Sequence, residues 1–288
     1  MKNLCQTLAA LLVLAISFTA CKKEVASNDP GNNPPPVGGN NPANDVVETK
    51  PAANKAISVN VNGNIGGFLA ALPARYDSTT KKYPLLVFCH GIGELGNGTT
   101  QLSNAAAVGT PSVIKWGEFP PNFSVGGKNY SFIVITPQFK NWPSGKDVND
   151  MIDYAIKNFR IDTARMYVSG LSMGGGVTWD FAVDYAKRVA AIAPICGASG
   201  PSDSKAQKIA QSGVAVWAFH NKDDGTVSYT NSEGYVNKIN SFSPPIKAKL
   251  TLWPTGGHDA WSKACSPNYK EDNMNMYEWM LQYSRISK

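Results

Sequence analysis

A short glycine–serine motif is the most informative chemical feature of the chain. Ser172 lies in Gly170-Leu-Ser-Met-Gly174, between an apolar run at 165–169 and a helix-like stretch at 175–186. A strand, a sharp turn and a helix in this order form a nucleophile elbow, in which the glycines leave space for a strained turn that exposes the serine hydroxyl above a sheet. The motif therefore predicts that Ser172 is a nucleophile. It also requires a base, an acid and an oxyanion hole nearby.

A histidine is the expected base, because a serine hydroxyl is not nucleophilic at its own pKa. The sequence has three histidines: His90, His220 and His258. In one order of a catalytic triad along the chain, the nucleophile comes first, then the acid and then the histidine. Only His258 follows a candidate acid; it lies in the segment Thr255-Gly-Gly-His-Asp-Ala-Trp261. We therefore expect His258 to be the base and His90 to be a structural hydrogen-bonding residue.

The acid should follow the preceding strand, which is the apolar run at 214–219. The segment after it contains Asp223 and Asp224. Both qualify by position, but neighbouring side chains cannot both point inward. One of them is expected to be the catalytic acid, and the other a solvated or turn residue.

Two backbone N–H groups are candidates for the oxyanion hole, which must face the negative charge that develops on the substrate. One belongs to Met173, directly after the nucleophile. The other lies in the loop after the strand at 85–89, where Gly91 permits a close backbone approach. We expect the backbone N–H of Ile92 to be the donor in this loop. Taken singly, Ser172, His258 and the aspartates could be loop and turn residues, but their joint placement at strand ends favours catalysis.

The elements that must position these residues follow from the apolar pattern. Continuous apolar runs, typical of strands buried on both faces of a parallel sheet, alternate with helix-like stretches. The alternation predicts an α/β fold with a mostly parallel central sheet, helices on both faces and function at the carboxyl ends of the strands. The expected strands are 57–61, 67–74, 83–89, 132–136, 165–169, 189–195, 214–219 and 248–253, and the clearest helices are 147–159 and 274–285.

The N-terminal region is typical of an exported protein. A lysine precedes an apolar run at 4–18, and Thr19-Ala-Cys21 supplies small residues before a cysteine. Residues 1–20 resemble a bacterial lipoprotein signal peptide, which implies lipidation of Cys21 and a membrane anchor at the periplasmic or cell surface. Ordinary secretion is the alternative. Residues 21–53, rich in Asn, Pro and Gly, are expected to be a disordered tether, and 54–288 the folded domain.

Charge and cysteine content exclude several other functions. The net charge of +6 is scattered, with no basic run that interleaves with aromatics, so nucleic acid is not an expected partner. Apart from Cys5 and Cys21, the cysteines are Cys89, Cys196 and Cys265, and no pair has the spacing of metal ligands. We expect no metal and no cofactor. Whether Cys196 and Cys265 form a disulfide stays open.

Together these motifs resemble serine esterases of the α/β-hydrolase superfamily. The resemblance covers about residues 65–283 and is carried by His90-Gly-Ile-Gly-Glu, Thr136-Pro-Gln, Gly257-His-Asp-Ala-Trp and, most specifically, the run 160–175. It is nearest to polyhydroxybutyrate-depolymerase-like and feruloyl-esterase-like enzymes, with dienelactone hydrolases and phospholipase/carboxylesterases nearby. It implies a Ser-His-Asp acyl-enzyme mechanism on an α/β-hydrolase fold.

The resemblance also distinguishes between the two aspartates. These families carry His-Gly-x-x-Asp-x-x-Val after the corresponding strand, and His220, Asp224 and Val227 match that spacing. Asp224 is thus the implied acid. The chain departs from the family pattern at Asn221, where Gly is usual, and at Leu95, where Arg is common. The second departure bears on substrate preference more than on chemistry.

Substrate is less well defined by the sequence. Trp142 and Trp261 are candidate substrate-binding residues, and 102–129 is the expected cap-like loop. An exported, tethered esterase suits feruloyl or acetyl esters of plant polysaccharides. The alternatives are a general carboxylesterase, a peptidase of the same fold, or an inactive glycan-binding surface lipoprotein.

Overall fold

The computed structural model describes residues 47–285. The expected signal peptide at 1–20, Cys21 and the tether up to residue 46 lie outside the described residues. Within 47–285, no helix has both the length and the apolar content needed to cross a membrane.

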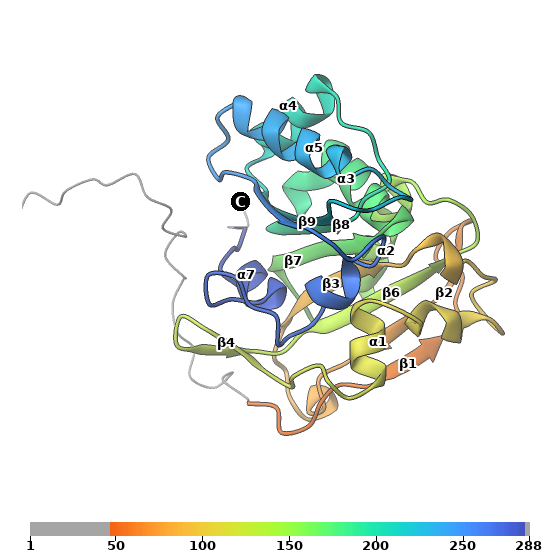
Figure 1. The fold of residues 1–288 in the computed structure, drawn as a ribbon. Helices are drawn as coiled ribbons and strands as arrows, with labels where there is room; N and C mark the ends of the chain where they lie inside the picture. The colour runs from red at the N-terminus through yellow and green to blue at the C-terminus, as the bar shows by residue number, and fades with distance from the viewer. Residues whose placement is uncertain (1–46, 286–288) are drawn as a thin grey trace, which may run out of the picture. The chain divides into compact units, whose positions relative to one another are not determined.

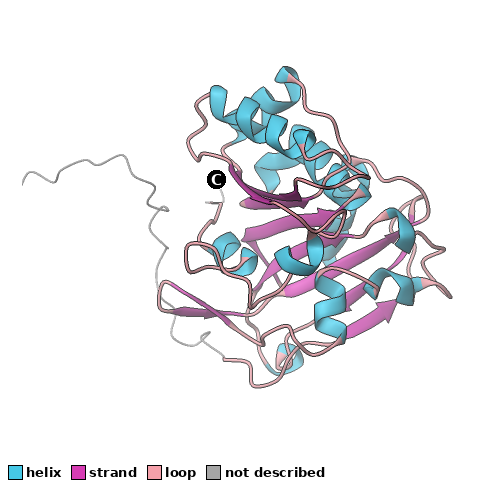
Figure 2. Cartoon of the chain, viewed as in Figure 1, coloured by secondary structure: helices cyan, strands magenta, loops and turns pink. Residues whose placement is uncertain are grey.

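A mixed sheet of eight strands forms the centre of the fold (Figures 1 and 2). Its spatial order is β1-β2-β6-β3-β7-β8-β9-β10. The six strands from β6 to β10 in this order are parallel, and β2 pairs antiparallel with both β1 and β6. The bounds are β1 Asn54–Ile57, β2 Ile65–Ala71, β3 Tyr83–Cys89, β6 Ile133–Phe139, β7 Ile161–Leu171, β8 Ala191–Ile195, β9 Ala215–Asn221 and β10 Lys249–Trp253.

Helices cover both faces of this sheet, because its strands are apolar on both sides. One apolar cluster unites the sheet with α2, α3, α4 and α5, and the other unites it with α1, α6, α7 and the β4–β5 hairpin. The predicted α/β-hydrolase-type sheet is therefore confirmed. The bounds are α1 Thr110–Lys115, α2 Gly145–Asn158, α3 Met173–Tyr185, α4 Asp203–Ser212, α5 Thr230–Ser241, α6 Trp261–Ala264, α7 Met276–Leu281, β4 Phe123–Val125 and β5 Lys128–Tyr130.

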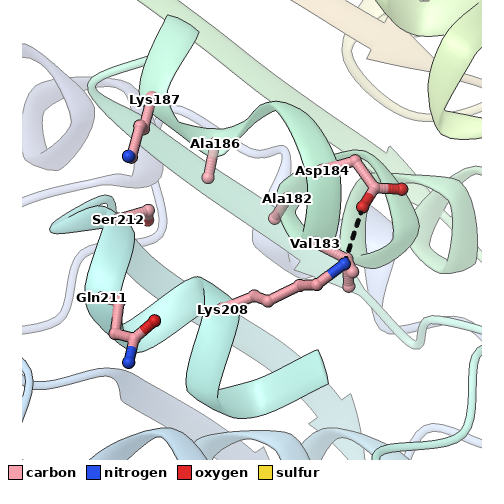
Figure 3. A pocket seen from close by; sticks show the side chains of 8 residues that line it. All are labelled: Ala182, Val183, Asp184, Ala186, Lys187, Lys208, Gln211 and Ser212. Atoms are coloured by element: carbon pink, nitrogen blue, oxygen red, sulfur yellow. Dashed lines mark hydrogen bonds and ion pairs between the residues drawn. The ribbon is translucent and has the colours of Figure 1, made fainter. Parts of the chain in front are cut away.

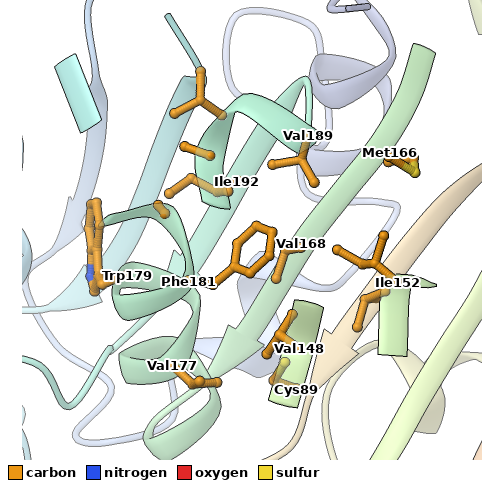
Figure 4. Packing of buried hydrophobic residues seen from close by; sticks show 14 of the residues in the cluster. Cys89, Val148, Ile152, Met166, Val168, Val177, Trp179, Phe181, Val189 and Ile192 are labelled. Carbon is orange, nitrogen blue, oxygen red and sulfur yellow. The ribbon is translucent and has the colours of Figure 1, made fainter. Parts of the chain in front are cut away.

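The central strand β3 shows how the period-2 pattern divides the core. Leu85 and Val87 belong to the cluster on the α2–α5 face, whereas Leu86 and Phe88 belong to the opposite cluster. On the first face, Phe181 of α3 points toward Val168 of β7, as Figure 4 shows. Burial on both faces holds the strand ends, and the loops that follow them, in fixed positions.

Two local expectations differ from the structure. The first strand is 54–57 rather than 57–61, because Asn62 turns the chain by accepting the N–H groups of Asn64 and Ile65. Val59 and Val61 pack against the core from this connection instead of pairing in the sheet. The expected cap-like loop at 102–129 contains a 3-10 helix, α1 and the strand β4.

The folded part begins before residue 54, which corrects the expected tether boundary at 53. Glu48 is buried, and its carboxylate accepts the Arg75 N–H at 2.8 Å and the Tyr83 hydroxyl at 3.4 Å. Its backbone N–H donates to the Asn122 side chain at 2.8 Å. The polar composition of the segment concealed this contact, since a single buried carboxylate leaves no periodic signal.

Replacement of Glu48 by alanine should therefore destabilise the domain. We expect Glu48→Ala to lower the free energy of unfolding by about 2 kcal/mol, because the Arg75 N–H and the Tyr83 hydroxyl lose their acceptor. Urea unfolding of the full chain measures this. Glu118→Ala, at an exposed glutamate, is the matched control and should change stability by less than about 0.5 kcal/mol. Equal effects of the two substitutions would show that Glu48 is no part of the fold.

Candidate active site

Ser172 lies at the turn between β7 and α3, in a backbone conformation that few non-glycine residues adopt. Its φ is 53° and its ψ is −116°. The turn is held on both sides: the Ser172 N–H donates to the Ile195 carbonyl at 3.0 Å, and the Ser172 carbonyl accepts the Ala198 N–H at 3.0 Å. Such conformations cost about 1–3 kcal/mol and persist only where the surroundings fix them.

The motif glycines are required by close backbone approach. A Cβ atom on Gly174 would lie 2.0 Å from the Cys89 carbonyl oxygen, and one on Gly170 would lie 2.5 Å from the Gly174 carbonyl oxygen. Any larger residue at either position would separate β3, β7 and the start of α3. The glycines thus let the end of β3 pack directly against the first turn of α3.

Ser172, His258 and Asp224 form a continuous hydrogen-bonded chain. His258 Nε2 lies 2.8 Å from Ser172 Oγ, and His258 Nδ1 lies 2.7 Å from Asp224 Oδ2. Because a carboxylate only accepts, Nδ1 carries the ring proton and Nε2 is free to accept the serine proton. The three residues come from the ends of β7, β9 and β10, so the parallel sheet brings together what the sequence separates.

The carboxylate of Asp224 is buried and fully engaged. Its Oδ1 accepts the N–H groups of Thr226 at 2.8 Å and Val227 at 2.9 Å. Its Oδ2 accepts His258 Nδ1 and lies 3.2 Å from His220 Nε2. Burial alone would raise the pKa of Asp224, but the hydrogen bonds from His258, Val227 and Thr226 outweigh burial and lower its pKa. Asp224 is therefore ionised when His258 needs a counter-ion.

His220 is a buried neighbour of the Asp224 carboxylate. The Ser232 hydroxyl lies 2.8 Å from His220 Nδ1, and His220 Nε2 lies 3.0 Å from the Val227 carbonyl. Since the carbonyl only accepts, Nε2 carries the proton and Nδ1 accepts from Ser232. Burial lowers the pKa of His220, so the ring is neutral. The sequence indicated His220 only through its spacing to Asp224, and no motif predicted that Ser232 would hydrogen-bond to it.

Asp223 and Asn221 hold the loop that carries His258. Asp223 accepts the N–H groups of Gly256 at 3.1 Å and Gly257 at 2.8 Å, and Asn221 donates from its side chain to the Gly257 carbonyl at 3.0 Å. Asp223 thus binds a neighbouring loop. The sequence reasoning missed this role, although two adjacent glycines before a candidate base are a signal that their N–H groups need acceptors.

The two oxyanion-hole candidates are both first residues of helices. Met173 opens α3, and Ile92 opens the 3-10 helix Ile92–Glu94. The first N–H groups of a helix have no acceptor within it, which makes both candidates for binding an incoming oxygen. A Cβ atom on Gly91 would lie 3.8 Å from Ser172 Cβ, which places the loop of Ile92 beside the nucleophile.

His90 is tied into the backbone. Its Nδ1 lies 2.7 Å from the Gly91 carbonyl, and its Nε2 accepts the Phe139 N–H at 3.0 Å. Burial lowers its pKa to about 4. With both ring nitrogens occupied, His90 joins the loop after β3 to the end of β6, in the structural role expected of it.

The two candidate tryptophans differ in position. Trp261 opens α6, and its ring lies 5.3 Å from that of His258 in a perpendicular arrangement. Trp142 lies in the loop between β6 and α2 and is 53% exposed. Among the described residues, no hydrogen bond or ring contact joins Trp142 to Ser172, His258 or Asp224. The structure thus brings only Trp261 into direct contact with the candidate base.

Cys196, Asp224 and His258 form a group of residue types that bind metal ions. Potential ligand atoms of Cys196, Asp224 and His258 lie within 4.8 Å of one another. The thiol of Cys196 donates to the His258 carbonyl, and burial raises its pKa, so a metal would have to displace both this proton and the Nδ1 proton. Cys89, Cys196 and Cys265 are all free and buried, which answers the open question of a Cys196–Cys265 disulfide.

A separate recess of about 250 Å³ lies between the C-terminal ends of α3 and α4 (Figure 3). It contains the Asp184–Lys208 ion pair, with 3.1 Å between the charged atoms. None of its lining residues belongs to the Ser172–His258–Asp224 chain. Its Ser212 hydroxyl donates to the Ile209 carbonyl and faces no histidine of the lining, so the candidate chemistry stays at the carboxyl ends of the strands.

Comparisons with known proteins agree with this fold. Residues 76–266 match the family model described as phospholipase/carboxylesterase. A bifunctional acetylxylan esterase/xylanase from Neocallimastix patriciarum is 33% identical over 133 residues, which are 46% of this chain and 17% of that protein. Feruloyl esterase D of Neurospora crassa is 25% identical over 186 residues, which are 60% of this chain and 58% of that protein. The chain therefore spans less than two thirds of the length of either curated relative.

Solved structures show the same fold at lower identity. A thermostable esterase superimposes with a TM-score of 0.58 at 24% identity, covering 81% of this chain and 63% of that one. A mutant of the feruloyl esterase module from Clostridium thermocellum, complexed with sinapinate, gives a TM-score of 0.53 at 20% identity, covering 74% of this chain and 83% of that one. At these identities the likeness establishes the fold alone.

The buried, neutral His90 should make the fold sensitive to acid. Its pKa is about 4 in the folded state against 6.5 when unperturbed, so only the unfolded chain gains a proton as the pH falls below 6.5. The free energy of unfolding should therefore fall by about 2 kcal/mol between pH 7 and pH 5 from this group. Urea unfolding at both pH values measures the loss. His90→Gln should reduce it, and an unchanged pH dependence in this variant would contradict the assignment.

Proposed function

The chain belongs to the phospholipase/carboxylesterase family, and we propose that it is a serine esterase that hydrolyses carboxylic esters through Ser172, His258 and Asp224. The observation that carries this proposal is the hydrogen-bonded chain of these three side chains, at a turn where Met173 begins α3. The base lies within hydrogen-bond distance of both the nucleophile and the acid, which is the arrangement that acyl transfer requires.

The reaction proceeds in two steps. Ser172 Oγ attacks the ester carbonyl while His258 Nε2 takes its proton, and the N–H groups of Met173 and Ile92 stabilise the oxyanion. When the C–O bond to the alcohol breaks, His258 returns the proton to the departing oxygen and an acyl group remains on Ser172. Water, deprotonated by His258, then attacks the acyl carbon, and the proton returns to Ser172 as the acid is released. Asp224 holds the His258 tautomer and stabilises its cation in both steps.

Feruloyl or acetyl esters of plant polysaccharides are the substrates we favour. The support is that two curated relatives are named an acetylxylan esterase/xylanase and a feruloyl esterase. The sequence adds a signal-peptide-like start and Cys21, from which we propose an exported lipoprotein with a lipid anchor at the periplasmic or cell surface. Such a position would suit a polymeric substrate outside the cell.

An inactive glycan-binding protein is the alternative from another class. It would have no use for a strained Ser172 backbone or for an aspartate held by three hydrogen-bond donors. A general carboxylesterase or a peptidase of the same fold would use the same three side chains. Substrate comparison separates these readings.

Ester hydrolysis should depend on this chain of side chains. We expect hydrolysis of methyl ferulate or p-nitrophenyl acetate by the full chain, and loss of it in Ser172→Ala. In Asp224→Asn the ring tautomer is no longer fixed, so kcat should fall by about 10³- to 10⁴-fold. The measurement is kcat/KM on both esters. Full activity of Ser172→Ala would refute the assignment, and activity on the acetate alone would indicate an acetyl or general esterase.

A further inference from the structure

An open cleft of about 280 Å³ lies beside His258. One wall is the loop 107–109 with α1 and Trp116, and the other is the start of α6 at Trp261 and Ser262. The two walls lie more than 140 positions apart in the sequence, and the C-terminal segment brings them together next to α1 (Figure 1). This cleft is the one recess among those described whose lining contacts the candidate base.

Contacts at its inner end connect the cleft to the reacting groups. The Trp261 ring is perpendicular to the His258 ring, with 5.3 Å between ring centroids. On the opposite wall, a Cβ atom on Gly109 would lie 3.0 Å from the Leu171 side chain, which directly precedes Ser172. The cleft therefore lies on the Trp261 side of the His258 ring.

The lining combines an aromatic ring with polar groups. The Trp116 side chain is 71% exposed, although Lys115 Nζ lies 5.5 Å from the centre of its ring. Glu118, Ser112 and Ser262 provide a carboxylate and hydroxyls on the same lining. A flat aromatic surface that stacks on C–H faces, next to acceptors for hydroxyl groups, is suited to a sugar ring.

We propose that this cleft is the subsite for the alcohol part of the substrate, a sugar residue that stacks on Trp116. The inference rests on the proposed function and assigns one side of the same site. His258 must return its proton to the departing oxygen, so the alcohol leaves on the His258 side of the ester carbon. The cleft that begins at Trp261 is adjacent to this position, and a sugar ester can occupy it where a methyl ester cannot.

The test compares esters that share an acyl group and differ in the alcohol. Feruloyl-arabinose is compared with methyl ferulate, and acetylated xylobiose with methyl acetate. In Trp116→Ala, kcat/KM on the sugar esters should fall about tenfold and that on the simple esters should change less than about twofold. Trp116→Phe, which keeps a flat ring, should restore most of the loss. Phe242→Ala removes an exposed aromatic at the end of α5 and is the matched control.

Three kinetic outcomes would overturn the proposal. An equal loss of kcat/KM in Trp116→Ala on both esters of a pair would place the acyl group on Trp116. No loss of kcat/KM on either ester would show that the Trp116 ring contacts no substrate. Loss in Trp142→Ala instead of Trp116→Ala would move the subsite to the loop after β6.

Direct binding separates failure of this proposal from failure of the proposed function. Ser172→Ala should bind arabinosylated xylo-oligosaccharides in calorimetric titration, and the double variant with Trp116→Ala should lose this binding. If the wild-type chain hydrolyses none of the four esters but Ser172→Ala still binds the sugar, the cleft stands and the esterase proposal falls. If the esters are hydrolysed but no binding depends on Trp116, the cleft assignment falls.

Discussion

The Asp224 carboxylate is the point at which three separate segments of the chain meet. It accepts hydrogen bonds from the turn at Thr226 and Val227 and from His258 after β10, and it lies 3.2 Å from His220 Nε2 within β9. Burial of a carboxylate is costly unless its oxygens are satisfied, and here every contact also fixes a functional group. The orientation of the His258 ring, and hence the position of Nε2 beside Ser172, follows from this one residue.

The sheet supplies the rigidity that such a site requires. Six parallel strands end at one edge, so the residues after β3, β7, β9 and β10 converge although they are widely spaced in sequence. The strained backbone of Ser172 is fixed by Ile195 at the end of β8 and by Ala198 beyond it. Asp223 and Asn221 then restrain the Gly256–Gly257 segment, whose glycines would otherwise leave His258 free to move. Strain and flexibility at the site are thus both offset by contacts from neighbouring strands.

Much of this could be predicted from the sequence, because the informative features are periodic or local. Apolar runs identified the parallel strands, and the glycine–serine motif with the chain order identified Ser172 and His258. The choice of Asp224 over Asp223 needed a family resemblance, since adjacent aspartates look alike until one of them meets a partner. Features that depend on contacts between segments distant in the sequence could not be predicted from it. No periodic signal marks the burial of Glu48, the contact of Asp223 with the glycine loop, or the position of Trp116 opposite Trp261. The alternating Val59 and Val61 suggested a strand, but this segment packs against the core without pairing in the sheet.

The central claim is that acyl transfer passes through a covalent intermediate on Ser172. The most direct test is mass spectrometry of the full chain, quenched in acid during the first turnover of an ester and then digested. We predict that the peptide containing Ser172 gains the mass of the acyl group, and that this gain is absent in Ser172→Ala. Turnover without this adduct, or an adduct on a different residue such as the neighbouring Cys196, would contradict it.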